Sequence, residues 1–347
     1  MNTVISADVN SSALKHNLSI VHEKAPKSRV MAIVKGDAYG HGAVNVAKFL
    51  ESADSFGVAR LGEAIELRHG GIDAPIVILE GVLDVNELRL TAELNLDLVV
   101  HSKHQIDLLN THRFSGEVWV KVTTGMNRLG FPSSSLDEVL LKLKDRNVVG
   151  IMSHFASADS DKAFTDNQVE IFVSETKKLS LPLSIANSAG ILSFPDSHLD
   201  WVRPGIMLYG GSPYDRAIPE LKSAMTLLAP VIAVNNIRAS QSVGYGRTWM
   251  ADKDTRVAVL GVGYADGYPR EISNGVAMLG GLRRNIVGRI SMDMLCVELE
   301  ESDSVSVGDT LELWGSLLRI EEVASRSNTI PYTLMCGVGT RVRRKYF

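Results

Sequence analysis

Eight short apolar runs recur between residues 29 and 205, and stretches of helix length lie between them. The runs occupy residues 29–35, 55–60, 75–81, 96–101, 117–122, 148–154, 181–187 and 199–205. The helical stretches repeat apolar residues at spacings of three and four, at 43–53, 61–70, 84–94, 135–145 and 166–179, with Ser135 and Asp166 as expected N-caps. Strands that alternate with helices predict parallel pairing through crossover helices. Eight of them predict a closed, TIM-like (β/α)8 barrel.

The pattern changes after about residue 230, where runs such as RVAVLGVGYAD and DTLELWG are separated by Gly, Asp and Asn turns. Long helical patterns are lacking there, which predicts a separate, mostly β domain. We therefore expect an α/β protein with an N-terminal barrel at 1–230 and a C-terminal mostly-β domain at 231–347. The first ~10 residues are a candidate to pair with the β domain.

The composition is that of a globular chain with a large core, 45% hydrophobic and 22% charged. A net charge of −4 gives no electrostatic basis for binding nucleic acid, and the basic cluster at 341–345 is expected to be a solvated tail. The sequence begins without a signal-peptide pattern and has no 18-residue apolar window, so we expect a cytoplasmic protein without membrane contact. Cys296 and Cys336 lack metal-ligand spacing and are expected to be reduced thiols; no metal site is expected.

Polar and charged side chains stand at the ends of five of the eight expected strands. The carboxyl ends of barrel strands face one mouth, where the working residues of such barrels lie. The side chains at these ends are Lys35, Lys121, His154, Asn187, Ser188 and Arg203. We expect them to converge on one pocket.

Lys35 ends the first strand in AIVKGDAYGHG. A lysine at a strand end can simply extend its amine to solvent. A lysine that is desolvated at a barrel mouth instead has a lowered pKa and forms a Schiff base with a carbonyl. The seventh and eighth strand ends add the Ser188 hydroxyl and the backbone N–H groups of Gly205 and Ile206, in the place where barrels frequently bind phosphate. Ser188 is equally suited to capping a short following helix.

The stretch AIVKGDAYGHG resembles the lysine signature of the alanine racemases, a family of fold type III enzymes that use pyridoxal 5′-phosphate (PLP). IANSAG, RPGIMLYG, VGYADGYPR and VGRISMD resemble further motifs of that family, in the family's order and from end to end of the chain. The resemblance implies an isomerase that interconverts L- and D-alanine through a Cα carbanion, for D-alanine supply to peptidoglycan or for D-alanine catabolism. The cofactor-binding residues that it implies are Lys35, Tyr39, His154, Asn187, Ser188, Arg203, Gly205 and Ile206.

The resemblance places Arg203 at the pyridine nitrogen of the cofactor, with His154 supporting it. A guanidinium cannot accept a proton, so the ring nitrogen would stay largely unprotonated and the ring would be a weaker electron sink. A less delocalised carbanion favours protonation at Cα over transamination. The alternative for His154 is a buried histidine with a purely structural hydrogen bond.

Racemisation needs one proton-transferring group on each face of the Cα plane. The resemblance implies Lys35 for one face and Tyr264, in GVGYADGYPR, for the other. Taken alone, a tyrosine in a strand is more often part of the core. In the family this tyrosine reaches the site from the other subunit, which implies a homodimer.

The substrate carboxylate is the expected partner of Arg128, in KVTTGMNRLG, and of the Met292 backbone N–H, in GRISMDM. Lys121 matches a lysine that is often carbamylated in the family and that then positions the arginine. Thr123 stands where the family commonly has Asp or Asn, which weakens the case for carbamylation. An isolated GMNRLG would otherwise carry a surface arginine, and an isolated SMDM an ordinary turn.

Arg289 and Asp293 are expected to support the entrance of the site. Thr340 stands where some relatives have a tyrosine on the phosphate side, so a broader racemase of small amino acids such as serine is one alternative. A PLP-dependent decarboxylase is a second, although it would be expected to place an acid, not an arginine, at the pyridine nitrogen. A non-catalytic PLP homeostasis protein is a third, but such proteins lack the β domain.

Overall fold

The computed structural model describes residues 4–347, which form two compact units. The barrel unit consists of residues 15–38 and 42–208, and the β-domain unit of residues 4–14, 39–41 and 209–347. The expected boundary at 230 falls inside a long strand, β11 (Met225–Ile237). Residues 1–3 of the expected N-terminal domain lie outside the described residues.

Eight parallel strands close the barrel, each overlapping one of the eight predicted runs. They are β2 (Arg29–Ile33), β3 (Ser55–Val58), β4 (Ile76–Ile78), β5 (Asp97–Val100), β6 (Glu117–Thr123), β8 (Asn147–Met152), β9 (Leu183–Ser184) and β10 (Trp201–Val202), and β7 (Phe131–Pro132) adds to β6. The pairings run from β2 through β3, β4, β5, β6, β8, β9 and β10 back to β2, so the (β/α)8 prediction is confirmed. Most observed strands end before the predicted runs do, and the remaining residues form the loops at the carboxyl ends.

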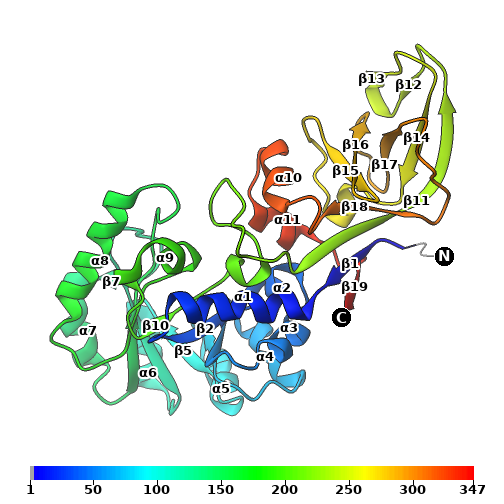
Figure 1. Ribbon diagram of the computed structural model, residues 1–347. Coiled ribbons are helices and arrows are strands. Elements are labelled where there is room, and N and C mark those ends of the chain that lie inside the picture. The colour runs from blue at the N-terminus through cyan, green and yellow to red at the C-terminus, as the bar shows by residue number, and fades with distance from the viewer. Residues whose placement is uncertain (1–3) are drawn as a thin grey trace. The chain divides into compact units, whose positions relative to one another are not determined.

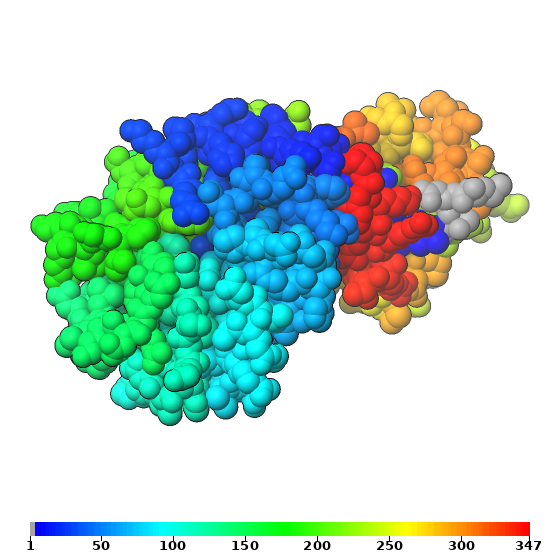
Figure 2. Space-filling model, turned by 90° about the horizontal axis from the view of Figure 1, so that it is seen from below, coloured from blue at the N-terminus to red at the C-terminus, as the bar shows by residue number. Residues whose placement is uncertain are grey.

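Helices follow the strands in chain order, and the surface of the barrel unit runs correspondingly from blue through cyan to green in Figure 2. They are α1 (Ser11–Lys24), α2 (Lys35–Gly40), α3 (Ala43–Phe49), α4 (Leu61–His69), α5 (Val85–Glu93), α6 (Lys103–Thr111), α7 (Leu136–Lys142), α8 (Lys162–Thr176) and α9 (Ser188–Ser193). Each longer helix buries one apolar face, as Leu61, Ala64 and Leu67 do in α4.

Neither of the two predicted N-cap side chains caps its helix. Ser135 is the N-cap position of α7, but its hydroxyl donates to the Pro132 carbonyl and does not cap the helix. Asp166 is not a cap, because α8 begins four residues earlier than predicted. Asp161 caps this helix by accepting a hydrogen bond from the Phe164 N–H at 3.0 Å.

The β-domain unit contains the second predicted domain and is mostly antiparallel (Figure 1). Its strands β11, β14 (Thr255–Leu260), β17 (Leu295–Leu299), β16 (Leu282–Val287), β15 (Val276–Leu279) and β18 (Thr310–Trp314) pair in that order, and β18 pairs with β11 to close the ring. A hairpin of β12 (Ser242–Val243) and β13 (Trp249–Met250) and the helices α10 (Ile320–Arg326) and α11 (Pro331–Gly337) complete it. The polar turns that separate its short strands are the ones that the sequence pattern indicated.

The first described strand belongs to this unit. β1 (Ser6–Val9) pairs antiparallel with β11 and parallel with the C-terminal strand β19 (Arg343–Tyr346). The predicted solvated basic tail is therefore wrong. Arg344 donates to the carbonyls of Gly40, Gly339, Val342 and Val338, because strand pairing brings its guanidinium beside them.

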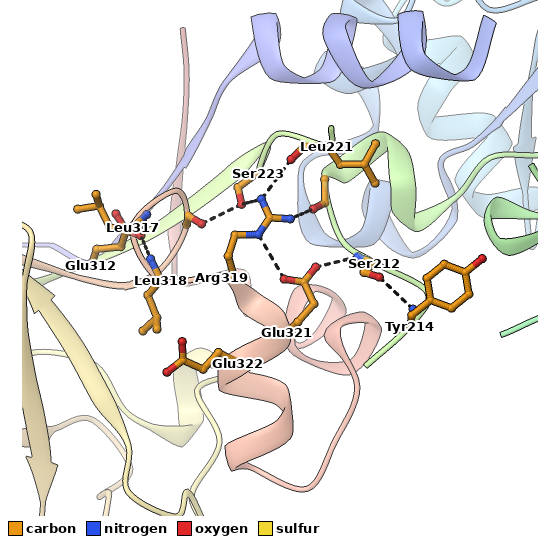
Figure 3. Close-up of polar contacts among 12 residues, drawn as sticks. Ser212, Tyr214, Leu221, Ser223, Glu312, Leu317, Leu318, Arg319, Glu321 and Glu322 are labelled. Carbon is orange, nitrogen blue, oxygen red and sulfur yellow. Dashed lines mark hydrogen bonds and ion pairs between the residues drawn. The ribbon is translucent and has the colours of Figure 1, made fainter. Parts of the chain in front are cut away.

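A buried polar cluster fixes residues 210–223 within the β-domain unit (Figure 3). Arg319 donates to the carbonyls of Gly210 and Leu221 and to the Ser223 hydroxyl, at 2.7, 3.3 and 3.1 Å. Glu321, only 4% exposed at its side chain, accepts from Arg319 and from the Ser212 backbone N–H. The cluster thus satisfies backbone groups in a segment that has no regular structure.

Among residues 4–347, no helix combines the length and the apolarity of a membrane span. Within the same residues, no three His, Cys, Asp or Glu side chains gather as a metal site would require.

Candidate active site

α2, directly after the first barrel strand, has an unusual backbone. Gly36, Asp37, Ala38, Tyr39 and Gly40 all have positive φ values, between 52° and 77°. Such a left-handed turn is strained for residues other than glycine, and strain of this kind concentrates at functional sites. The Asp37 carboxylate holds the turn by accepting from the Ala43 N–H at 2.8 Å.

Lys35 is the first residue of this turn and its side chain is exposed. A desolvated lysine was expected at this position, and the exposed side chain differs from that expectation. The amine is instead presented openly at the mouth of the barrel. It is therefore accessible to a carbonyl compound.

Lys121 carries the lowered pKa that the argument assigned to Lys35. Burial and the charges of Arg203, Arg128 and Lys35 lower the pKa of Lys121 from 10.5 to about 8, while Glu80 acts in the opposite direction. These interactions show that the four cations, predicted from separate strands and loops, converge. A cluster with this much positive charge is suited to an anionic ligand.

Arg203 is the buried member of the cluster, with 5% of its surface exposed. It donates to the Ser184 hydroxyl and the Ser153 carbonyl, each at 2.5 Å, and to the Ile185 carbonyl at 3.3 Å. These partners are neutral, and burial lowers the arginine pKa to only about 10. The guanidinium thus keeps its full charge at neutral pH.

The fourth partner of Arg203 is His154, whose Nδ1 lies 3.3 Å from the arginine Nη2. Burial, followed by the charges of Arg203, Lys121, Arg128 and Lys35, holds the pKa of His154 well below its ordinary value. A neutral imidazole has a lone pair on one nitrogen, so Nδ1 can accept from the guanidinium. The contact between His154 and Arg203 is the one that the sequence led us to expect.

A layer of polar side chains that was not predicted lies beside this pair. Ser184 and Ser153 bind Arg203, and Gln168 of α8 donates to the Thr124 hydroxyl at 3.1 Å and to the His154 carbonyl at 3.2 Å. The sequence feature that could have indicated this layer is a polar residue inside an apolar run, since Ser153 and Ser184 interrupt two predicted strands. A polar side chain in a buried strand needs a partner, and here the partner is the site.

The loop after β6 explains how Thr123 serves where the family commonly has Asp or Asn. Its hydroxyl accepts from the Asn127 N–H at 2.9 Å and closes a turn in which Asn127 has a φ of 54°. This turn carries Arg128, which is exposed. Lys121, Arg128 and His154 are among the residues that line a shallow depression beside the turn.

Ser188 is the first residue of α9, and Asn187 is its cap. The Asn187 side chain accepts from the Gly190 N–H at 3.0 Å, so the capping alternative for Ser188 is wrong. The Ser188 hydroxyl instead accepts from the N–H groups of Gly205, at 3.0 Å, and Met207, at 3.4 Å. Ile206 lies between these two residues, so the predicted phosphate-side residues of the seventh and eighth strand ends do come together.

The other predicted site residues lie in the β-domain unit. Tyr39 stacks on Tyr209 with ring centroids 4.8 Å apart, and burial, assisted by Tyr332 and Cys336, raises the pKa of Tyr39. Tyr264 is 41% exposed at the start of a short turn, η5 (Tyr264–Asp266). Arg289, Met292 and Asp293 are exposed as well.

The fold and the site together define a class of protein. A (β/α)8 barrel that gathers an exposed lysine and three further cations at its mouth, joined to a β domain with an exposed tyrosine, is the arrangement of a two-domain barrel enzyme that acts on a small anionic ligand.

Comparison with known proteins identifies the family. The family model described as "Alanine racemase, N-terminal domain" matches residues 9–213, and the one described as "Alanine racemase, C-terminal domain" matches residues 224–346. The chain belongs to the alanine racemase family. Alanine racemase from Nitrosococcus oceani is 45% identical to it, over 97% of this chain and 98% of that protein.

Solved structures agree with the sequence relatives. The biosynthetic alanine racemase from Pseudomonas aeruginosa is similar over 99% of both chains, with a TM-score of 0.93 and 39% identity. The alanine racemase from Bartonella henselae, described with covalently bound pyridoxal phosphate, covers 99% of this chain and all of its own, with a TM-score of 0.90 and 29% identity.

Proposed function

We propose that this chain is a PLP-dependent alanine racemase that interconverts L- and D-alanine with Lys35 and Tyr264 as its two proton-transferring groups. The observation that carries the proposal is the match of both domains to the family over nearly the whole chain. The site geometry supports it, because the barrel mouth combines an accessible amine with a cluster of cations.

The residues present fit the cofactor. The positive cluster suits a ligand that carries a phosphate and a phenolic oxygen, and the neutral surroundings of Arg203 suit an uncharged ring nitrogen. When bound, PLP supplies a conjugated ring that stabilises negative charge at the substrate Cα. Lys35 would hold it covalently, Tyr39, Ser188, Gly205 and Ile206 would bind its phosphate, and Asn187 orders the phosphate-side turn by capping α9.

Arg203 would face the ring nitrogen of the bound cofactor and would give up no proton to it. Ser184, Ser153 and His154 hold the guanidinium in place through hydrogen bonds. A donor that keeps its proton would limit how far the ring withdraws charge from Cα, and this would favour return of the proton to Cα over transamination.

Two groups on opposite faces of the substrate exchange its Cα proton. Tyr264 removes the proton from the L-enantiomer, and the Lys35 amine serves the D-enantiomer. Arg128 and the Met292 N–H bind the substrate carboxylate, and Arg289 and Asp293 support the entrance. In a homodimer Tyr264 would serve the partner's Lys35, and its 41% exposure in the single chain is in keeping with such a role.

Lys121 is a candidate for carbamylation, which would turn a cation beside Arg128 into an anion. Only the neutral amine attacks carbon dioxide, and a pKa of about 8 makes a fraction of it available at neutral pH. Continuous density for a carbamate on Lys121 in a high-resolution map supports the modification. A well-ordered, unmodified amine there contradicts it.

The test of the function is to incubate purified protein with L-alanine in deuterated water and to follow optical rotation and deuterium at Cα. Racemisation places deuterium in both enantiomers and drives the rotation to zero. Formation of pyruvate, or of carbon dioxide and an amine, would contradict the proposal. L-Serine in a parallel reaction measures how narrow the substrate range is, because Thr340 stands where a tyrosine is found in some relatives.

A further inference from the structure

The turn that presents Tyr264 is stabilised from inside by Asp266. The Asp266 carboxylate accepts from the Gly263 N–H through Oδ2 at 2.8 Å, and its side chain is only 2% exposed. A carboxylate buried to this degree needs a positive partner as well as hydrogen bonds. The positive partner of Asp266 therefore helps to fix the geometry of the Tyr264 turn.

The same turn is hydrogen-bonded to the Met292 loop. The N–H groups of Tyr264 and Ala265 donate to the carbonyls of Ser291 and Met292, at 3.2 and 3.0 Å. The two segments approach so closely that a Cβ atom at Gly263 would lie 2.2 Å from the Met292 carbonyl oxygen. Backbone hydrogen bonds thus hold the turn of Tyr264 against the loop that is proposed to bind the substrate carboxylate.

Residues 339–341, near the C-terminal strand, contact both the Tyr264 turn and the Met292 loop. The Gly339 N–H donates to the Asp266 carbonyl at 3.0 Å, and two residues further on Arg341 reaches both loops. Its Nε lies 2.8 Å from Asp266 Oδ1, in ion-pair rather than aligned hydrogen-bond geometry, and its Nη2 donates to Asp293 Oδ1 at 2.6 Å. A single guanidinium therefore bridges the turn of the tyrosine and the loop of the methionine.

We propose that Arg341 is a positioning residue for racemisation, which clamps the Tyr264 turn to the Met292 loop through Asp266 and Asp293. The proposal rests on the proposed function, because it gives the clamp its purpose. Arginine suits this task, since its planar group presents several donors in fixed directions and can hold two carboxylates at once. Lysine offers one point charge in its place.

The pair of Arg341 with Asp293 is expected to affect geometry more than global stability, because both side chains are about half exposed and exposed ion pairs contribute little to unfolding free energies. Loss of the pair with Asp266 lowers the unfolding free energy as well, because it leaves a buried carboxylate without its positive partner. Proton transfer depends far more steeply on distance, and a displacement of about 1 Å can reduce the rate by about 100-fold. Loss of Arg341 should thus slow the step that Tyr264 performs in a protein that remains folded.

The experiment compares the wild-type holoenzyme with Arg341→Met, Arg341→Lys and, as a matched control, Arg283→Met. Arg283 is a similarly exposed arginine of the same unit, and it pairs with Glu322 away from both loops. We expect Arg341→Met to lower kcat by about 10- to 100-fold, Arg341→Lys to recover part of it, and Arg283→Met to match the wild type.

Isotope effects identify the slowed step. In Arg341→Met the isotope effect with Cα-deuterated L-alanine should rise, because removal of that proton by Tyr264 becomes rate-limiting, while the effect with Cα-deuterated D-alanine should fall. Amide hydrogen exchange at Tyr264 and Ala265 should become faster, since both N–H groups bond to the Met292 loop. Unchanged isotope effects and unchanged exchange overturn the proposal, as does an equal loss in Arg283→Met.

Asp293→Asn provides an independent variant if Arg341→Met fails to fold, because it keeps the side-chain size and removes one ion pair only. The same changes at smaller amplitude support the clamp, and their absence overturns it. A wild-type enzyme that does not racemise alanine would contradict the proposed function. Amide hydrogen exchange would still measure whether Arg341 holds the two loops together.

Discussion

At the scale of the residue, the mouth of the barrel is defined by charge that the fold does not neutralise. Lys35, Lys121, Arg128 and Arg203 repel one another, and Glu80 is the acid that offsets the charge at Lys121. Such a concentration of like charge destabilises a folded protein unless a bound anion neutralises it. The site is thus suited to an anionic ligand.

Lys121 makes this repulsion measurable. Its pKa is about 8 in the folded protein and 10.5 without the fold, so the folded state disfavours its proton. The penalty is complete below pH 8 and disappears as the pH rises from 8 to 10.5. We expect Lys121→Met to raise the unfolding free energy of the apoprotein at pH 7 by about 2 kcal/mol, with no gain at pH 10.5.

Urea unfolding of the apoprotein at several pH values between 7 and 10.5 measures this difference. Lys144→Met, at an exposed lysine of the same unit, should show no such pH dependence. A difference between wild type and Lys121→Met that stays constant over this range would contradict the lowered pKa.

Tyr264→Phe separates the two proton transfers. The variant keeps the ring and loses the hydroxyl, so exchange of the L-alanine Cα proton for deuterium should fall at least about 100-fold. The visible absorbance of the bound cofactor should stay the same, because Lys35 is untouched. Full activity in both directions would remove Tyr264 from the mechanism.

At the scale of the element, the left-handed turn of α2 places Lys35 and Tyr39 four positions apart, with Gly36 between them and Gly40 directly after Tyr39. Gly40 has a φ of 77°, and a Cβ atom there would lie 2.2 Å from the Met335 carbonyl oxygen. Gly40→Ala should therefore lower the unfolding free energy by more than about 2 kcal/mol. Gly71 has a φ of 81° but open space around it, so Gly71→Ala should cost only about 1 kcal/mol. Equal urea midpoints for the two variants would contradict the close contact.

Two adjacent glutamates of α10 offer a second comparison (Figure 3). Glu321→Ala leaves the buried Ser212 N–H without its acceptor and should lower the unfolding free energy by about 1–3 kcal/mol. Glu322 pairs with Arg283 and Arg326 but is 29% exposed, so Glu322→Ala should cost less than about 1 kcal/mol. Thermal or urea unfolding decides between them, and the reverse order would mean that the Ser212 contact is unimportant.

Local patterns explain why most elements were predictable. Apolar periodicity identifies a strand or a helix from its own residues, and the eight-fold alternation identifies the barrel, so Lys35, Lys121, His154 and Arg203 could be placed at one mouth. Partners distant in sequence leave no such local pattern. The support of Arg203 by Gln168 through His154, and the pairing of Arg341 with Asp266, depend on contacts that only the folded chain creates.

At the scale of the whole molecule, the proposed dimer predicts complementation between inactive chains. Lys35→Ala keeps Tyr264, and Tyr264→Phe keeps Lys35, so a mixed dimer contains one site with both groups. Mixing the two inactive variants after reversible dissociation should restore up to about one quarter of wild-type activity, since half of randomly paired dimers are mixed and each has one intact site. Activity that fails to return, while mixed dimers are detected by mass spectrometry, would place Tyr264 in the site of its own chain.

The strand β1 has a consequence for how the protein is made. Residues 6–9 leave the ribosome before the barrel strands, yet their partners lie in β11 and at residues 343–346, which are synthesised after the barrel. The barrel strands pair only with one another, so the strand that carries Lys35 at its end can pair before β1 finds its partners. A change in β1 therefore acts on a part of the protein that assembles after the barrel.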